Sequence, residues 1–399
     1  MKRKILETLF SFAKRFFSFK NVISHFIFLV TNHNSMKIKD ITQFLETIAP
    51  PQYQEGYDNA GLIVGDPMTE ITGVLICLDS IETIIDEAVE RGCNLVVAHH
   101  PIVFKGLKRF TGKNYVERTI IKAIKNDIAI YAIHTNLDNV LQSGVNTKIC
   151  ERLGLTNCRI LAPKRQTLMK LTTFVPYPQT KDVLNALFAA GAGQIGEYKN
   201  CSFRTEGVGT FRPTGTANPT IGVLDKDESV AEARIEVIFD HFLEKKVLSA
   251  LKNAHPYEEV AYYLHVLENE NLAVGSGMIG EIEEISGIDF LLLLKMSMHV
   301  SCVKHTALLE KKVKKVAVCG GTGGFLLNHA IAADADVFVT ADYKYHEFFD
   351  ADGKIVIADI GHFESEQFTI DLLNDVLQKQ FEKLNVFSTK NITNPVNYL

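Results

Sequence analysis

The chain has 399 residues, which is enough for two or three domains. Hydrophobic residues make up 46% and charged residues 22%, close to the average of globular proteins, and this excludes a disordered chain, a collagen-like chain and a coiled coil. The seven cysteines contain no C-x-x-C pair, which excludes a disulfide scaffold and favours a reducing, cytoplasmic compartment, and the formal charge of −5 argues against a general nucleic-acid-binding protein.

Residues 1–35 form a basic segment that differs from the rest of the chain. They hold six Lys or Arg and one Glu, a net charge of +5, so residues 36–399 carry −10. Their apolar run at 22–30 is too short to span a membrane, and no signal-peptide cleavage pattern follows it. Because Met36 opens a sequence typical of the start of a compact domain, we expect residues 1–35 to be an upstream extension outside the native protein. A membrane-surface or targeting helix is the alternative.

Strands and helices alternate in the next part of the chain. Apolar runs predict strands at 74–78, 95–98 and 128–133, and helical spacing predicts helices at 81–91, 115–125 and 144–153. This alternation indicates α/β units with a largely parallel sheet. We assign residues 36–166 to a first α/β lobe.

The middle of the chain has a different pattern. It predicts strands at 171–175, 234–239 and 261–267, helices at 181–190 and 241–253, and glycine-rich turns between 191 and 222. This order indicates a small α+β domain of the ferredoxin-like type. We expect residues 167–272 to be inserted between two lobes.

The C-terminal part repeats the α/β alternation. Strands are predicted at 316–319, 337–340 and 355–358, with helices at 325–333 and, as one long helix, at 364–384. Residues 273–399 are therefore assigned to a second α/β lobe, which completes an α/β core.

Polar residues that could bind a metal follow two strands of the first lobe. In open α/β sheets, functional sites gather outside the carboxyl ends of the strands. His99 and His100 follow a fully apolar strand, and two imidazoles at that position are good ligands for a transition metal. Asp138 follows the next strand and could bridge two cations. The alternatives are polar strand caps for the histidines and a helix cap for Asp138.

His362 and Glu366 offer a second part of the same site. At positions i and i+4 of a predicted helix they share one face and can reach one ion, although an exposed polar pair is the alternative. Three imidazoles and two carboxylates together suit two divalent ions per chain, of zinc, iron, manganese or cobalt.

Other residues are candidates for proton transfer or anion binding. Asp342 and His346 are an i, i+4 pair expected to face the same cavity, and His134 could orient Asp138 or carry protons, unless it is a satisfied core histidine. The run 320–324, Gly-Gly-Thr-Gly-Gly, follows a strand and could hold a phosphate, with a tight turn as the alternative.

Several strings resemble the signatures of the GTP cyclohydrolase 1 type 2 homolog family, also called NIF-three-like proteins. The strings are Val-Val-Ala-His-His-Pro (96–101), His-Thr-Asn-Leu-Asp (134–138), Thr-Ala-Asp-Tyr-Lys-Tyr-His (340–346), Gly-His-Phe-Glu-Ser-Glu (361–366) and Tyr-Asp-Asn-Ala-Gly-Leu (57–62). In the middle of the chain, His-Pro-Tyr-Glu-Glu-Val-Ala-Tyr (255–262) matches a motif of the inserted domain of the longer members. Family members often have Trp where this chain has Tyr57.

The resemblance implies a two-lobed α/β protomer, a dinuclear metal site and a ring-shaped homohexamer. It assigns metal ligation to the five residues already singled out: His99, His100, Asp138, His362 and Glu366. The expected activity is metal-dependent hydrolysis of a small molecule, with the guanine ring of GTP suggested by the family label and a phosphoester equally suited to such a site. The alternative is a non-catalytic metal-binding or regulatory scaffold.

Overall fold

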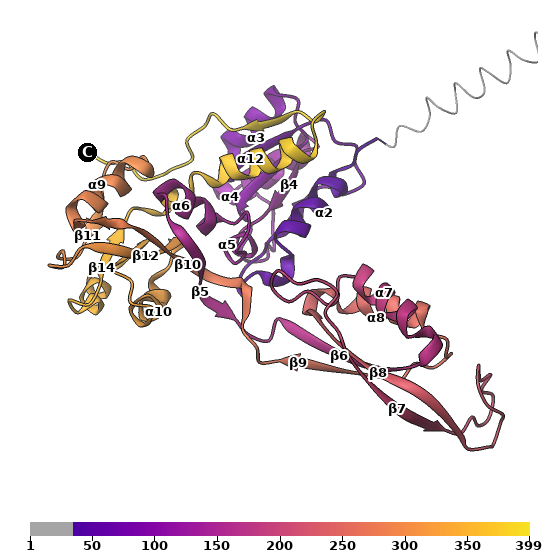
Figure 1. Cartoon of the computed structure of the whole chain (residues 1–399). Coiled ribbons are helices and arrows are strands. Elements are labelled where there is room, and N and C mark those ends of the chain that lie inside the picture. Colours follow the sequence, from indigo (N-terminus) through magenta and orange to yellow (C-terminus); the bar gives the residue numbers. More distant parts are fainter. Residues whose placement is uncertain (1–34) are drawn as a thin grey trace, which may run out of the picture.

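The computed structural model describes residues 35–399, so the predicted N-terminal extension lies outside the described residues except for Ser35. Three β-sheets organise the described residues, and Figure 1 shows two of them with their helices beside each other and the third projecting to one side. Within the described range, none of the helices has both the length and the apolar character needed to cross a bilayer.

The first sheet is mostly parallel, as expected. Its strand order is β1-β4-β3-β2-β15, and only β1 runs antiparallel to its neighbour. The strands are β1 (Gly61–Val64), β2 (Val74–Asp79), β3 (Leu95–His100), β4 (Ala129–Ala132) and β15 (Val386–Ser388). The surrounding helices are α2 (Ile38–Ile48), α3 (Glu82–Glu90), α4 (Tyr115–Lys125) and α12 (Thr369–Gln380).

Helices cover both faces of this sheet, which explains its continuous apolar strands. Val74 and Ile76 of β2 pack in the same cluster as residues of α2 and α12, whereas Leu75 and Cys77 pack with residues of α3 and α4. Because successive side chains of a strand point to opposite faces, a strand covered on both sides needs apolar residues at every position.

The second sheet combines parallel and antiparallel strands in the order β11-β14-β13-β12-β10-β5. Only β12, β13 and β14 are parallel to one another. The strands are β5 (Thr156–Lys164), β10 (Asn271–Ile285), β11 (Lys304–His305), β12 (Val313–Thr322), β13 (Val337–Ala341) and β14 (Val356–Asp359). The helical elements near it are α5 (Thr135–Asp138), α6 (Val145–Leu153), α9 (Gly287–Ser297), η4 (Gly324–Leu326), α10 (Leu327–Ala332), η5 (Tyr345–Ala351) and α11 (His362–Glu366).

Two strands cross the limits expected for the lobes. β5 precedes residue 166 but pairs with β10 of the second sheet, and β15 lies near the C-terminus but pairs with β2 of the first sheet. The two halves therefore exchange strands and pack as one unit, and the core cluster contains residues from both.

The single long helix expected at 364–384 is wrong, because the structure has two helices there. α11 packs against β12 and β13, and α12 packs against β2 and β15 of the other sheet. One straight helix could not lie on both sheets. The break at Gln367 and Phe368 lets α11 present its side chains between the sheets while α12 covers the first sheet.

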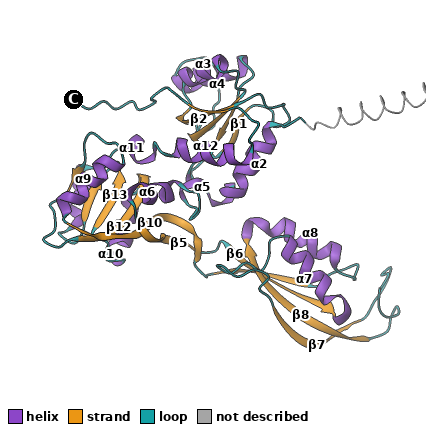
Figure 2. Cartoon of the chain, turned by 45° about the horizontal axis from the view of Figure 1, so that its top comes forward, coloured by secondary structure: helices purple, strands orange, loops and turns teal. Residues whose placement is uncertain are grey.

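The third sheet is antiparallel, with the order β7-β8-β6-β9. It consists of β6 (Leu168–Pro176), β7 (Phe203–Phe211), β8 (Glu228–Asp240) and β9 (Tyr262–Leu267), with helical elements η2 (Tyr177–Gln179), α7 (Thr180–Ala189), η3 (His241–Leu243) and α8 (Glu244–Ala254). α7 and α8 lie together on one face of this sheet (Figure 2). Strand β7 lies within the stretch that the sequence suggested was only glycine-rich turns.

Candidate metal centre

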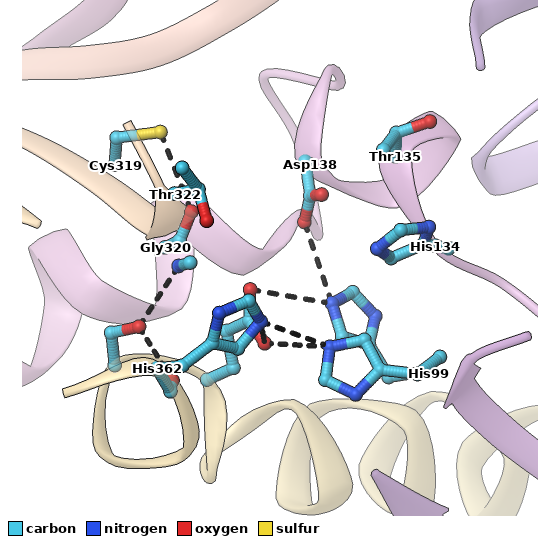
Figure 3. A network of polar contacts seen from close by, with 12 residues as sticks. His99, His134, Thr135, Asp138, Cys319, Gly320, Thr322 and His362 are labelled. Carbon is cyan, nitrogen blue, oxygen red and sulfur yellow. Dashed lines mark hydrogen bonds and ion pairs between the residues drawn. The ribbon is translucent and has the colours of Figure 1, made fainter. Parts of the chain in front are cut away.

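The five predicted ligands lie together between the first and second sheets. His99 and His100 end β3, Asp138 ends α5, and His362 and Glu366 begin and end α11. They border a cavity of about 1070 Å³ that is lined by residues of both sheets, except that His99 is fully buried behind it. Figure 3 shows the rings of His99 and His362 on opposite sides of the cluster. The carboxylate of Asp138 lies above the ring of His99, and a dashed line joins the two.

Glu366 is the central member of the cluster. Its Oε2 lies 2.9 Å from Nε2 of His100 and 3.3 Å from Nε2 of His362. Its Oε1 lies 3.8 Å from Nε2 of His99, so one buried carboxylate faces three imidazoles. The i, i+4 geometry expected for His362 and Glu366 is present, because both residues belong to the single turn and a half of α11.

Each of the three histidines is oriented by a partner of its Nδ1 atom. Nδ1 of His99 lies 2.9 Å from the carbonyl oxygen of Ile133. Nδ1 of His100 lies 2.9 Å from Asp79, and Nδ1 of His362 lies 2.7 Å from Asp342. An Nδ1–H donor held in this way points Nε2 toward the centre, where its lone pair can bind a metal once Nε2 carries no proton, which is the usual arrangement around a metal-binding histidine.

The cluster shifts the pKa values of its members in opposite directions. Burial opposes protonation of His100, but hydrogen bonds to Asp79 and Glu366 outweigh it and raise the His100 pKa to about 10. Burial likewise opposes protonation of His362, and Glu366 and Asp342 raise its pKa to about 9. For fully buried His99 burial dominates, and its pKa is lowered.

The two carboxylates also differ. Burial and the nearby charge of Glu366 raise the pKa of Asp138 well above its usual value. Burial would raise the pKa of Glu366 as well, but hydrogen bonds from the histidines lower it well below its usual value. The metal-free cluster therefore holds several protons at neutral pH that a cation would displace.

Two buried polar atoms in the cluster have no hydrogen-bond partner. Nε2 of His99 and Oδ1 of Asp138 are both inaccessible to solvent, face each other at 3.7 Å and bond to no other group. Buried polar atoms are nearly always satisfied, and a separation of this size between two ligand atoms leaves room for a shared cation. The donor set therefore fits a divalent metal ion.

The potential ligand atoms form overlapping groups. One group contains His99, Asp138 and Glu366, and another contains His100, His362 and Glu366. The atoms within each group lie within 4.8 Å of one another, and Glu366 belongs to both. A third group joins His134 to the adjacent histidines His99 and His100.

His134 lies at the edge of the cluster and is held by Asp58. Its Nδ1 lies 2.8 Å from Oδ1 of Asp58, and its ring centroid is 5.3 Å from the rings of both His99 and His100. The side chain of Asp58 is fully buried and also accepts hydrogen bonds from the backbone and hydroxyl of Thr135, at 3.0 and 2.5 Å. Burial raises the Asp58 pKa, but the hydrogen bond and charge of His134, together with the hydrogen bond from Thr135, outweigh it and lower the pKa to about 2.

The structure separates the pair Asp342 and His346. Asp342 lies before η5 with φ at 60°, so the two residues do not share a helical face as expected. Asp342 lines the cavity and bonds to His362 and to the hydroxyl of Thr322. His346 is exposed beside Tyr345 and Phe349 and is absent from the lining of the cavity.

The glycine-rich run at 320–324 forms the end of β12 and a turn against the cluster. Gly321 has φ at 61°, and a Cβ atom placed there would lie 2.5 Å from Oε1 of Glu366. Glycine at this position therefore allows the backbone of β12 to approach the carboxylate. The position of Glu366 therefore explains why a glycine occurs at residue 321 of this run.

Replacing Gly321 by alanine is expected to destabilise the chain by at least about 1 kcal/mol and to weaken metal binding, because the left-handed conformation is unfavourable for alanine and its methyl group would displace Glu366. Thermal unfolding with and without zinc measures both effects. Gly324→Ala is the matched control, since a Cβ there would meet nothing closer than 3.8 Å. Equal behaviour of the two variants would contradict this role of Gly321.

Two residues that orient the histidines were missed as site residues in the sequence. Asp79 ends a buried strand and is paired in register with His100 on the neighbouring parallel strand, a relation that could have been inferred once the strand order was known. Asp58 belongs to the string at 57–62, but no local pattern places it beside His134, which is 76 residues away in sequence.

These observations define an α/β protein with a buried His/Asp/Glu cluster between its two larger sheets that could hold metal ions. Residues 36–395 match the model of the Duf34/NIF3 (NGG1p interacting factor 3) family, and the chain belongs to this family.

Relatives in sequence and a similar solved structure cover most of the chain. A Bacillus subtilis protein named GTP cyclohydrolase 1 type 2 homolog is 38% identical over 372 residues, covering 92% of this chain and 99% of the relative. A Halalkalibacterium halodurans protein of the same name is 41% identical and covers 81% of this chain and 87% of its own length. The solved structure of a Bacillus cereus protein related to NIF3 is similar with a TM-score of 0.80 at 36% identity, covering 92% of this chain and all of that one.

Proposed function

We propose that the chain is a metal-dependent hydrolase whose centre holds two divalent ions. The observation that carries this proposal is the convergence of three Nε2 atoms on the two oxygens of Glu366, with Nε2 of His99 and Oδ1 of Asp138 left without a hydrogen-bond partner. His99, Asp138 and Glu366 would hold one ion, and His100, His362 and Glu366 the other, with Glu366 shared. Zinc, iron, manganese and cobalt all suit this ligand set.

When bound, two such ions would supply a nucleophile at neutral pH by lowering the pKa of a bound water and would polarise the group that is attacked. The chain's own contribution is to hold the ligands in place. Asp79 and Asp342 fix the rings of His100 and His362, and the carbonyl of Ile133 fixes that of His99. These contacts orient the Nε2 atoms before any metal enters.

His134 is placed to move a proton at the same cavity. It lines the cavity, its Nδ1 is engaged by ionised Asp58, and its other nitrogen lies near the cluster. Asp342 lines the cavity as well and is proposed to act through His362. The exposed position of His346 gives no support to the catalytic role suggested by its sequence position.

The proposed substrate is a small molecule, with a nucleotide ring or a phosphoester as the two classes to test. The names of the relatives point to GTP. The test is turnover of GTP, cyclic amides and phosphoesters by the chain loaded with each candidate metal, compared with Asp138→Asn. Turnover by the wild type that is lost in the variant supports the hydrolase. If no substrate is turned over by protein with confirmed metal occupancy, the hydrolase proposal fails.

Replacing Asp58 by asparagine is expected to lower kcat by about 100-fold or more with little change in KM, because an amide cannot hold the His134 Nδ1–H as the carboxylate does. Metal content should stay at the wild-type value, since Asp58 contacts none of the proposed ligands. Steady-state kinetics on the identified substrate, together with elemental analysis, measure the two quantities. An unchanged kcat would contradict the role given to His134.

A non-catalytic metal-binding or regulatory scaffold is the second candidate. It is favoured by the third sheet, which has its own core and projects from the rest of the chain (Figure 1). Its elements follow the order β-α-β-β-α-β, so we infer an inserted ferredoxin-like domain over 167–272. Metal-dependent changes in assembly without turnover would favour this candidate over the hydrolase.

We further propose a homohexameric ring and a cytoplasmic location, both by resemblance to the family. Light scattering coupled to size-exclusion chromatography tests the assembly. A mass near six times 44.5 kDa supports the ring, and a monomer at micromolar concentration overturns it.

A further inference from the structure

A second cavity lies on the third sheet and shares no lining residue with the metal centre. Its volume is about 1020 Å³, at the upper limit of the usual range for small-molecule sites. It is formed by the face of the sheet opposite α7 and α8, by the segment 210–221 and by the string at 255–262. That string was singled out in the sequence, and the metal centre does not use it.

A buried carboxylate faces this cavity. Glu232 on β8 is only 7% exposed. Its Oε1 accepts a hydrogen bond of 2.9 Å from the hydroxyl of Tyr257. No donor among the described residues bonds to its Oε2, which lies against the Cα of Gly209, where any Cβ would overlap it. Because Glu232 lines the cavity and has no cationic partner among the described residues, its Oε2 is available to a cationic ligand that enters there.

The charges that line the cavity leave an excess of carboxylates. Both arginines of the lining form ion pairs with acids outside it: Arg212 with Asp227 at 2.6 Å, and Arg234 at 2.6 Å with Glu236, which also pairs with Lys170. Four glutamates remain in the lining, and no ion pair joins them to a cation of the described chain: Glu206, Glu232, Glu258 and Glu259. The field in this cavity therefore favours a positively charged ligand.

Aromatic rings complete the lining. Phe174 and Tyr263 meet edge to face with centroids 5.8 Å apart, and Phe211 and Tyr257 lie 5.9 Å apart. Aromatic faces attract organic cations and pack against methylene groups. A metal ion is disfavoured, because the groups of converging ligand atoms found in the described chain all belong to the centre between the larger sheets.

We propose that this cavity binds an aliphatic amine, with one ammonium group donating to Oε2 of Glu232 and its methylene chain lying against the aromatic rings. The additional glutamates of the lining suit a diamine or a polyamine, whose second ammonium would lie near Glu206, Glu258 or Glu259. The proposal does not depend on the metal centre or on its activity.

Isothermal titration of the full-length chain with 1,5-diaminopentane tests the proposal, with uncharged 1,5-pentanediol as the ligand of matched shape. The diamine is expected to bind at least about tenfold more tightly than the diol. Glu232→Gln, which keeps an acceptor for Tyr257, should weaken diamine binding by at least about tenfold. Glu244→Gln on α8, which removes one acidic charge outside the cavity, should leave it unchanged.

A second variant guards against misfolding of the first. Gly209→Ala retains every carboxylate but fills the space beside Oε2, and it should weaken binding as well. Protein treated with a chelator should bind the diamine as the untreated protein does, which separates this result from the metal centre. No binding by the wild type, or equal loss in Glu232→Gln and Glu244→Gln, would overturn the proposal.

Discussion

Replacing Glu366 by glutamine is expected to remove metal binding from the whole centre, reducing bound metal from about two ions per chain to nearly none. The reason is geometric, because both of the groups proposed to hold an ion contain this one carboxylate. A glutamine can offer only one neutral oxygen where the carboxylate offers two charged ones. Equilibrium dialysis against zinc or manganese measures the occupancy, and any hydrolytic activity should fall with it.

The adjacent acid of α11 is a close control. Glu364 is also buried on the same helix, but its carboxylate accepts a hydrogen bond from Asn394 and contacts none of the three histidines. Glu364→Gln should therefore keep its metal. If both variants bind metal as the wild type does, Glu366 is not the shared ligand. If only one ion is lost from Glu366→Gln, the ion that remains has enough ligands without Glu366.

Metal affinity is expected to fall by about 100-fold for each pH unit of acidification between pH 8 and pH 6, because two protons compete with the metal. With pKa values raised to about 10 and about 9, His100 and His362 are protonated in the metal-free chain throughout this range. Binding must displace both protons, and the raised pKa of Asp138 adds to the competition. Affinity therefore increases as pH rises and is lost as pH falls.

Competition with a chromophoric chelator at several pH values measures this slope. Calorimetry in two buffers of different ionisation enthalpy counts the released protons directly. About two protons per chain are expected at pH 7 for the wild type. A slope near zero would mean that both imidazoles are already neutral in the metal-free chain, so that metal binding displaces no proton from their Nε2 atoms.

The fold class could be predicted because its signals are local. Buried parallel strands read as continuous apolar runs, so β2, β3, β13 and β14 were each located within about two residues. The partners of β5 and β15 could not be predicted, because strand pairing between distant segments leaves no local pattern. The division of the last helix was missed for the same reason, since it depends on the two sheets that α11 and α12 cover.

The sequence could identify the members of the cluster, because they occur at strand ends and at helical spacing. It could not predict how these residues are arranged around one another. Polar residues at the ends of apolar strands indicated His99, His100 and Asp138, and helical spacing indicated the pair on α11. The central position of Glu366 follows from how the two sheets face each other. The same limit explains Asp342 and His346, whose spacing suggested a shared face that the left-handed turn at Asp342 removes.

The metal content of the wild-type chain is the most direct test of the central claim. Elemental mass spectrometry on protein purified without chelators, and again after dialysis against each candidate metal, gives the number of ions per chain. The account predicts about two ions, with loss of metal in both Asp138→Ala and Glu366→Ala. A folded wild-type chain that neither contains metal nor takes it up on titration would contradict it.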